Sequence, residues 1–482
     1  MQCVDQKTYL AVLEEKLYSL RKLVLDLERV LPSKASNQFI QGLRLIIDAV
    51  DTFHRHRLKY LKANLSGNPQ QLEVQVAFDA KIGLRILGSV HQQYLPLLHA
   101  ESQRNEYLFY PSLERAIRLF TDSFELTLVP DFEYNYAFDG RENFANHEIE
   151  ILERHSDQET KEALAKLRTT QNLKRWITFL HFPVADRDSA LNLCILAHEL
   201  AHFVDSSAKI YQQLLPITLD KDTFEELVAA RCSTPAVGFA SKPGGPQLTF
   251  ETIFTRTGVE AKCYQTCYEM LANWIREIIA DIIAIHAIGP ASYFAFNDFF
   301  AYVGVENIWS NSHPLPAFRL KLMLDELKDT MGYPSAACPI GIVLADASTR
   351  VDASVKDTKY KDEAKVVQNT IEKSLSSILT KIRAAVSQYS FKYSSYQEVV
   401  PNTIDRLRRG IAPIEILDPK EARMVPAPII GILNAGWELY KTDMGAFYKE
   451  FRADVPELER LENFNHLLFK AIEASEVWRR WR

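Results

Sequence analysis

The sequence predicts an α+β protein that is predominantly α-helical, with a small β-sheet and helical regions at both ends of the chain. Apolar residues recur at helical spacing through most of the 482 residues. Residues that favour strands gather in only two places, at 124–138 and at 175–183. An apolar helical pattern over residues 191–208 follows the second of these clusters and contains the sequence HELAH.

The length exceeds what one hydrophobic core ordinarily supports, so we expect several regions. We predict an N-terminal helical region over residues 1–104, a mixed core over residues 105–345 and a C-terminal helical region over residues 346–482. The N-terminal region carries no catalytic signature. It is either a structural helical array or a module that binds a regulatory protein partner.

Three helices are predicted in the N-terminal region, over residues 6–31, 37–63 and 70–95, with breaks at Pro32 and at the sequence NLSGNP. Strands are predicted over residues 124–130, 132–138 and 175–183, and a charged helical stretch lies between the last two. A strand directly before the HELAH helix could hold an extended peptide substrate by edge pairing.

Composition narrows the class of protein. The hydrophobic content of 47% and the charged content of 24% are typical of a soluble globular protein. The net charge of −6 gives no reason to expect nucleic acid as the main partner. We find no signal peptide and no stretch suited to crossing a membrane. The six cysteines are too scattered for a disulfide framework, so we expect reduced thiols and a cytoplasmic location.

The HELAH sequence predicts a metal site. His198 and His202 are four residues apart, so a helix presents both imidazoles on one face, where they can bind one zinc ion. Glu199 stands next to the first histidine, where it can take a proton from a water molecule activated by the metal. Two histidines alone do not settle the matter, so a third ligand is needed.

A helix predicted over residues 259–288 offers that ligand. Glu277 can supply an oxygen, and Asp281, one turn later, can accept a hydrogen bond from a ligand histidine. Both acids lie among isoleucines and a tryptophan, where an unpaired carboxylate would be costly. A metal and a histidine would satisfy both of them.

Other third ligands are weaker candidates. Asp205 follows His202 too closely and is better explained as a residue at a helix end, while Cys194 precedes the motif by one turn. The metzincin pattern requires glycine at 205 and histidine at 208, and this chain has Asp205 and Ala208. His286 lies about two and a half turns beyond Glu277 and should face elsewhere.

The sequence NSHPLPAFRL at residues 311–320 adds two candidates. His313 precedes a proline in a rigid extended segment, and could donate a hydrogen bond to the oxyanion that forms during peptide hydrolysis. Arg319 lies in the helix predicted to follow and could brace Glu277 or Asp281.

Taken together, HExxH, ExxxD and SHPxPxxR in this order resemble the gluzincin metallopeptidases, nearest the branch that contains the CaaX prenyl-protein proteases and their soluble relatives. The resemblance covers roughly residues 175–325. It implies a zincin-like core with zinc bound by His198, His202 and Glu277. It also implies that Glu199 is the general base and that Asp281 accepts a hydrogen bond from a ligand histidine. His313 matches the histidine of the third motif and Arg319 its arginine. Unlike the membrane members, this chain has no predicted span.

We therefore expect a zinc-dependent peptidase, a hydrolase that acts on a protein or peptide substrate with Zn²⁺ as its cofactor. Two other interpretations remain open. One is a helical scaffold protein whose zincin core is structural, although such a protein would not need Glu199. The other is a protease effector that a partner releases through the helical flanks.

The remaining segments carry less information. Residues 233–247 are rich in glycine and proline and form either a lid or an ordinary surface loop. We expect a polar linker beyond residue 345, a helix over residues 364–388 and a loop-rich stretch from residue 408 to about 428. Two further helices are expected over residues 425–448 and 456–481.

Overall fold

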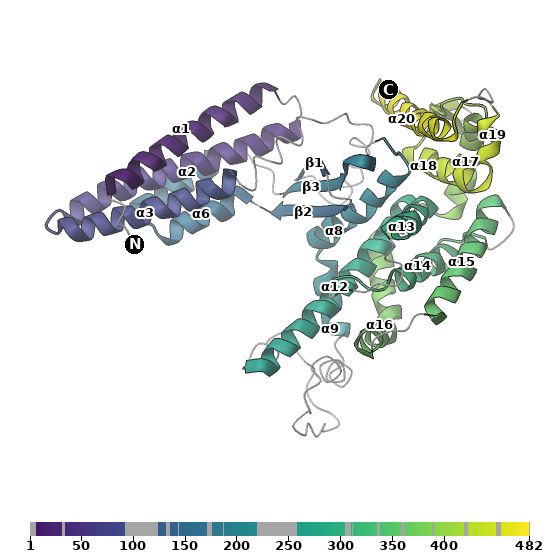
Figure 1. Ribbon diagram of the computed structural model, residues 1–482, viewed down its shortest axis with the longest axis horizontal. Coiled ribbons are helices and arrows are strands. Elements are labelled where there is room, and N and C mark those ends of the chain that lie inside the picture. The colour runs from purple at the N-terminus through teal and green to yellow at the C-terminus, as the bar shows by residue number, and fades with distance from the viewer. Residues whose placement is uncertain are drawn as a thin grey trace, which may run out of the picture. The chain divides into compact units, whose positions relative to one another are not determined.

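The computed structural model confirms a predominantly helical protein with little β-structure (Figure 1). It describes residues 6–30, 34–91, 124–131, 135–142, 144–170, 176–186, 188–218, 258–303, 310, 312–334, 338–357, 362–387, 390–418, 423–449 and 455–481. The loop at 233–247 lies outside these ranges. Among the described helices, none combines the length and the apolar character that a membrane span needs.

The chain forms two compact units. The N-terminal unit comprises Met1–Glu106 and Thr121–Val184, and the C-terminal unit comprises Tyr107–Phe120 and Ala185–Arg482. The region 105–345, expected as one core, is therefore divided between the two units. All the candidate site residues named above belong to the C-terminal unit.

The N-terminal unit is built mainly from helices that lie along one another (Figure 1). These are α1 (Gln6–Val30), α2 (Lys34–Leu65), α3 (Pro69–Ser89), α6 (Phe144–Arg154) and α7 (Gln158–Thr170). Their apolar faces meet in one core that includes Leu17, Ile46, Phe53, Leu87 and Ile149. The helical periodicity that predicts these elements is thus the pattern that builds this core.

A three-stranded sheet completes the N-terminal unit. Its strands are β1 (Phe124–Asp131), β2 (Ala137–Glu142) and β3 (Trp176–Pro183), and β3 lies in the middle. The expectation that β3 could hold a peptide by edge pairing was wrong, because β1 and β2 occupy both of its edges. β1 runs parallel to β3, with Leu128 opposite Leu180, while β2 runs antiparallel to it. The strands predicted at 124–130 and 175–183 are present. The one predicted at 132–138 instead begins at Ala137, and residues 132–134 lie outside the described part.

The C-terminal unit is almost entirely helical. After the short helices η2 (Val184–Asp186) and η3 (Asn192–Ile195), it contains α8 (Leu196–Ala208), α9 (Ile210–Thr218), α12 (Gly258–Ile288), α13 (Pro290–Val303), α14 (Pro316–Asp325), the π-helical turn η4 (Glu326–Thr330), α15 (Pro339–Asp357), α16 (Asp362–Val386), α17 (Tyr393–Arg408), α18 (Ile429–Thr442), α19 (Met444–Tyr448) and α20 (Glu457–Trp481).

The long helix α12 is the central element of this unit. It packs along α8, and also contacts α9, α13, α14 and α16. Its isoleucines, among them Ile275, Ile278 and Ile282, are fully buried in one core with Ala201 and Val204 of α8. This packing fixes the helix that carries His198 and His202 against the helix that carries Glu277 and Asp281.

The prediction of a polar linker beyond residue 345 was wrong, because α15 (Pro339–Asp357) occupies most of that stretch. Ile340, Leu344, Ala347 and Val351 recur at helical spacing and are buried. Small and polar residues between them hide this stripe in the sequence, but burying it on neighbouring helices stabilises the helix.

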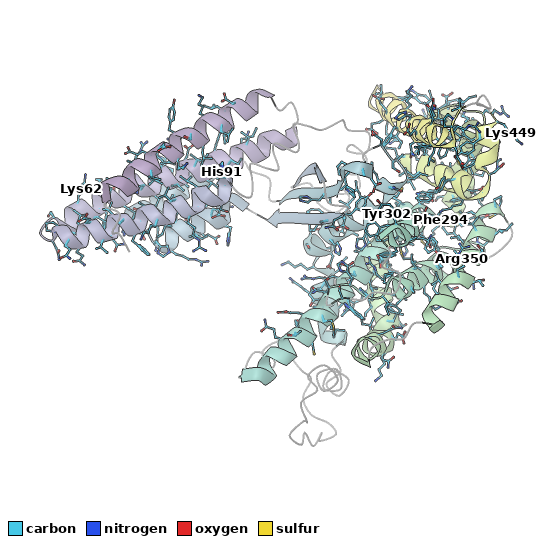
Figure 2. All side chains as sticks on the ribbon, in the orientation of Figure 1. Lys62, His91, Phe294, Tyr302, Arg350 and Lys449 are labelled. Carbon is cyan, nitrogen blue, oxygen red and sulfur yellow. The ribbon has the colours of Figure 1, made fainter. Side chains whose placement is uncertain are left out.

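The loop-rich stretch expected near residues 408–428 contains a two-stranded antiparallel sheet, β4 (Glu415–Asp418) and β5 (Arg423–Pro426). The helix expected over residues 425–448 is divided into α18 and α19, because Asp443 leaves the helical conformation and caps α19. On α18, Trp437 stacks on Phe294 of α13, with ring centroids 5.8 Å apart. Phe294 is labelled in Figure 2.

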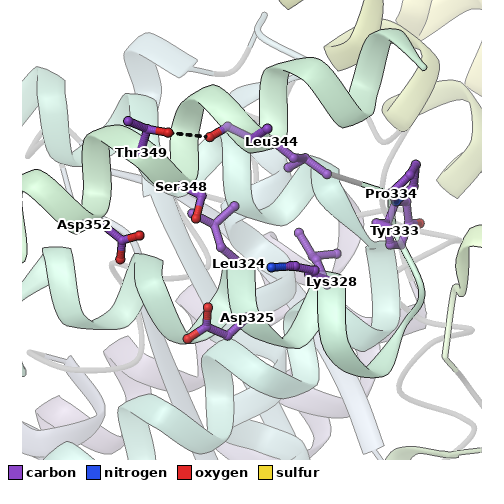
Figure 3. A pocket seen from close by; sticks show the side chains of 11 residues that line it. Leu324, Asp325, Lys328, Tyr333, Pro334, Leu344, Ser348, Thr349 and Asp352 are labelled. Carbon is purple, nitrogen blue, oxygen red and sulfur yellow. Dashed lines mark hydrogen bonds between the residues drawn. The ribbon is translucent and has the colours of Figure 1, made fainter. Parts of the chain in front are cut away.

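A cavity of about 220 Å³ lies between the α14–η4 segment and α15 (Figure 3). Its polar lining includes Asp325, Lys328 and Asp352, and Lys321 bridges the two acids. None of the site residues expected from the sequence lines this cavity.

Candidate metal centre

Helix α8 presents His198 and His202 on one face. Their Nε2 atoms are 3.1 Å apart, and the two rings meet edge to face. Both flanking turns are apolar and buried, which holds the helix in place. The four-residue spacing has the geometric effect expected from it, because the two imidazoles converge on one point.

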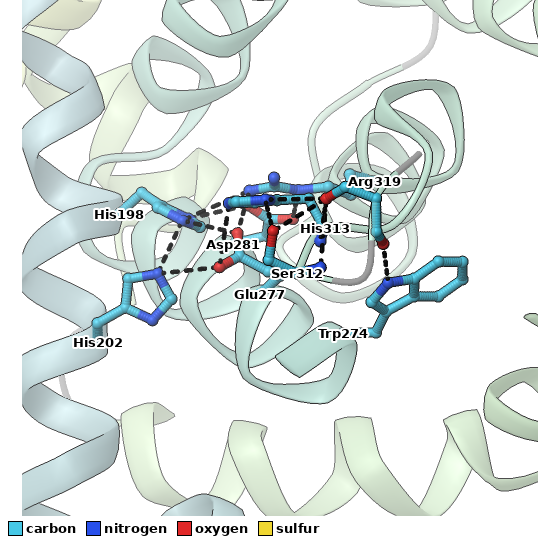
Figure 4. A network of polar contacts seen from close by, with 9 residues as sticks. His198, His202, Trp274, Glu277, Asp281, Ser312, His313 and Arg319 are labelled. Carbon is cyan, nitrogen blue, oxygen red and sulfur yellow. Dashed lines mark hydrogen bonds and ion pairs between the residues drawn. The ribbon is translucent and has the colours of Figure 1, made fainter. Parts of the chain in front are cut away.

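Helix α12 brings Glu277 to the same point (Figure 4). Its Oε2 lies 3.3 Å from Nε2 of His198, and its Oε1 lies 3.4 Å from Nε2 of His202. One ligand atom from each of the three residues falls within 4.8 Å of the other two. Two imidazole nitrogens and one carboxylate form a donor set that suits zinc.

Asp281 lies behind His198, one turn along α12 from Glu277. Its Oδ1 is 3.0 Å from Nδ1 of His198. This is an ion-pair distance, although the contact does not have the geometry of a regular hydrogen bond. A carboxylate there favours the tautomer with the proton on Nδ1. The lone pair of neutral His198 is then on Nε2, which faces His202 and Glu277.

Arg319, on the first turn of α14, reaches both acids. Its Nε and Nη2 donate hydrogen bonds of 2.8 Å to the two oxygens of Asp281. Nη2 also lies 3.1 Å from Oε2 of Glu277 and 3.4 Å from Nε2 of His198. The sequence left open which acid Arg319 would brace, and in the structure it contacts both.

The buried carboxylates at this site outnumber the buried guanidinium, so a divalent cation could balance their charge. Glu199, Glu277 and Asp281 are all buried, and the buried side chain of Arg319 contacts Glu277 and Asp281. Three carboxylates and one guanidinium leave two negative charges uncompensated when the histidines are neutral. In addition, Oε2 of Glu277 is buried and accepts no hydrogen bond from the described residues. The residues therefore fit a bound Zn²⁺.

The same imbalance shifts the pKa values of the ligands. Burial opposes protonation of His198, but the carboxylates of Asp281 and Glu277 outweigh it and raise the pKa of His198 to about 9. Burial would raise the pKa of Glu277, but Arg319 and the two histidines hold that pKa well below its ordinary value. The same pattern lowers the pKa of Asp281. The site thus keeps its acids ionised and attracts a positive charge.

Glu199 follows His198 directly and is 8% exposed. No hydrogen bond or ion pair within the described ranges involves its carboxylate. It lies near enough to Arg319 to stabilise the guanidinium charge and to help raise the pKa of Arg319. A carboxylate beside the metal ligands with no structural partner is available to accept a proton.

His313 stands at the mouth of the site. Its Nε2 lies 3.7 Å from Oε1 of Glu277, and its side chain is 55% exposed. Partial burial and the positive charge of Arg319 lower the pKa of His313 below its ordinary value. Pro314 and Pro316 carry the chain from His313 into α14, which starts at Pro316.

The weaker candidates are engaged elsewhere. Asp205 accepts a hydrogen bond of 2.7 Å from the backbone N–H of Tyr211, at the end of α8. The thiol of Cys194 is buried, which raises its pKa to about 12. His286 contacts Glu326 at 2.8 Å and Ser390 at 2.9 Å, away from the metal centre.

Phe296 and Ser310 were not expected from the sequence, and Ser312, the serine of the SHPxPxxR motif, was given no role there. The ring of Phe296, on α13, lies 4.9 Å from that of His198 and 5.3 Å from the guanidinium carbon of Arg319. Ser310 and Ser312 form hydrogen bonds around His313. Phe296 has no signal in the sequence, because it is one of four phenylalanines in α13, whereas the serines could have been noticed from their place beside His313.

Comparison of the chain with protein-family models, with curated proteins and with solved structures gives no match. The gluzincin resemblance therefore depends on the motifs and on the geometry of the residues that they contain.

Proposed function

We propose that this protein is a zinc-dependent peptidase of the gluzincin type, with a zincin-like core in its C-terminal unit. The observation that carries the proposal is the convergence of His198, His202 and Glu277 beside a buried, unengaged Glu199. A purely structural zinc site is usually closed by four protein ligands and has no use for such a carboxylate.

The residues have separate tasks in this proposal. Zinc held by His198, His202 and Glu277 would supply a Lewis acid that makes water acidic and polarises the peptide carbonyl. Glu199 accepts the proton of the attacking water and then donates it to the amine that leaves. The water oxygen bonds to the carbonyl carbon, whose oxygen takes up the π electron pair. When the carbonyl re-forms, the C–N bond breaks with its electron pair on the nitrogen that Glu199 protonates.

The residues around the ligands prepare these steps. Asp281 orients His198, and Arg319 holds Asp281 by two hydrogen bonds. Nε2 of His313 faces the site from its open side, where it can donate to the carbonyl oxygen as negative charge develops. The exposure of His313 leaves a side from which a peptide can approach.

The test compares the parent protein with Glu199→Gln on a mixture of peptides derived from whole proteins, with new termini identified by mass spectrometry. We expect cleavage by the parent, and a rate lower by about 10²–10⁴-fold in the variant. Zinc content should be equal in the two proteins, because glutamine keeps the shape of the side chain. Glu269→Gln, an exposed position on α12, serves as the control. Equal cleavage by parent and Glu199→Gln would refute the proposal.

A further inference from the structure

The segment that carries His313 is tied to the core at Ser310. The indole N–H of Trp274, on α12, donates a hydrogen bond of 2.9 Å to the carbonyl oxygen of Ser310. The backbone N–H of Ser310 in turn donates to the carbonyl oxygen of His313, at 3.1 Å. Trp274 is fully buried, so these bonds hold residues 310 and 313 in fixed positions relative to α12.

The hydroxyl oxygen of Ser310 is fully used as an acceptor. It accepts the backbone N–H of His313 at 3.0 Å and the backbone N–H of Ser312 at 3.2 Å. A hydroxyl oxygen has two lone pairs and one proton. Because both lone pairs are occupied, Ser310 contributes to any further hydrogen bond as a donor.

This fixes the direction of the next bond. The hydroxyl oxygens of Ser310 and Ser312 are 2.9 Å apart, so Ser310 donates and Ser312 accepts. The hydroxyl oxygen of Ser312 also lies 2.8 Å from Nδ1 of His313. Its own proton is still available and can point at that nitrogen.

The other nitrogen of His313 decides between the two tautomers. Nε2 lies 3.7 Å from Oε1 of Glu277, a carboxylate that is paired with Arg319 at 3.1 Å through its other oxygen. A bare lone pair on Nε2 would face a negative charge, whereas an N–H on Nε2 is attracted to it. The proton therefore belongs on Nε2, and Nδ1 is the acceptor of the Ser312 hydroxyl.

We propose that Ser310 and Ser312 form a directed hydrogen-bond chain that holds neutral His313 as its Nε2–H tautomer, with that N–H aimed into the metal centre. Ser310 and Ser312 are positioning residues, since they act on a substrate only through His313. The catalytic consequence rests on the proposed peptidase function, because the oriented N–H is what a developing oxyanion requires. The tautomer itself is a property of the protein without substrate.

The first test reads the tautomer directly. NMR of the imidazole nitrogens distinguishes a protonated nitrogen from a bare one, and His313→Gln assigns the signal. We expect the proton of neutral His313 on Nε2 in the metal-free parent protein, where Glu277 keeps its charge, and a mixture of tautomers in Ser312→Ala. Ser312→Thr retains the hydroxyl and should keep the parent tautomer. A proton on Nδ1 in the parent would overturn the inference, whatever the activity.

The second test measures turnover on a peptide that the parent cleaves. Ser312→Ala should lower kcat by about tenfold with little change in KM, a fraction of the loss seen when a whole oxyanion donor is removed. Zinc content should be unchanged, and Ser312→Thr should restore kcat. Ser312 is exposed, so neither variant threatens the fold. An unchanged kcat in Ser312→Ala would refute the positioning role. A zinc-loaded parent that cleaves nothing would instead refute the peptidase proposal and leave the tautomer result standing.

Discussion

Arg319 and Asp281 make a two-point contact at the back of the metal centre, with Nε and Nη2 of the arginine each 2.8 Å from one carboxylate oxygen. Both side chains are almost completely buried. The contact sets the plane of the carboxylate, and the carboxylate in turn faces Nδ1 of His198. The orientation of one ligand histidine therefore depends on a residue 121 positions away in the chain.

The first prediction concerns this contact. Arg319→Lys keeps the charge but loses the fork that binds both oxygens, so Asp281 can rotate and orient His198 less well. We expect zinc affinity to fall by about 10–100-fold, measured by competition with a chelator. Arg276→Lys is the control, because it makes the same substitution at an exposed position on α12, where the arginine stacks on Tyr211. This variant should bind zinc like the parent. Equal affinity in Arg319→Lys would show that the fork is dispensable.

The second prediction identifies the third ligand. Glu277→Ala removes the only carboxylate that contacts Nε2 of both histidines among the described residues. We expect about one zinc per chain in the parent and much less in the variant. Glu269→Ala, two turns earlier on α12 and exposed, should keep its zinc. No zinc in the parent, even after zinc is added back, would contradict the metal site itself.

The third prediction concerns the end of α8. Lys209 has a φ of 54°, the left-handed conformation that side chains with a Cβ rarely adopt. Lys209→Gly should raise the free energy of unfolding by roughly 0.5–1 kcal/mol, measured by denaturant titration. Ser206→Gly, in the exposed interior of the same helix, should lower it by a similar amount. Destabilisation by Lys209→Gly would contradict the assigned conformation.

The fourth prediction concerns acid stability. Burial would raise the pKa of Glu326, but His286 and Arg383 outweigh it and lower the pKa to about 2. Because this is below the ordinary value, the contribution to stability is complete above about pH 4.5 and is lost as pH falls toward 2. Glu326→Gln should therefore be less stable than the parent near neutral pH, and the difference should shrink in acid. A difference independent of pH would refute the ionised state of Glu326.

Much of the metal centre could be predicted from the sequence because its constraints are local. Helical spacing alone places His198 beside His202, and the same rule places Glu277 one turn from Asp281. Which helix meets which depends on tertiary packing, yet an apolar stripe on each helix and the need to satisfy buried acids were enough to pair them. Arg319 was named for the same reason.

Other features could not be predicted from local patterns. Helix α15 was mistaken for a linker because the apolar residues that stabilise it are diluted by small and polar ones, and its partners are distant in sequence. Phe296 contacts His198 only through the way α13 packs, and nothing in the sequence of α13 distinguishes it from the other phenylalanines of that helix. The hydrogen bonds that run from Ser310 through Ser312 to His313 depend on which atom donates in each pair, and the spacing of residues in the sequence does not determine this.

The carboxylates buried between α8 and α12 have a consequence for the stability of the protein as well as for catalysis. Without a cation, their charge is balanced only by Arg319 and by a proton on His198, whose pKa is raised to about 9, so a metal that binds there would also favour the folded chain. Each tenfold rise in free zinc above its dissociation constant would add about 1.4 kcal/mol to the stability of the folded state. The amount of folded protein would then depend on the zinc concentration. A shortage of zinc would lower the amount of folded protein as well as the proposed peptidase activity.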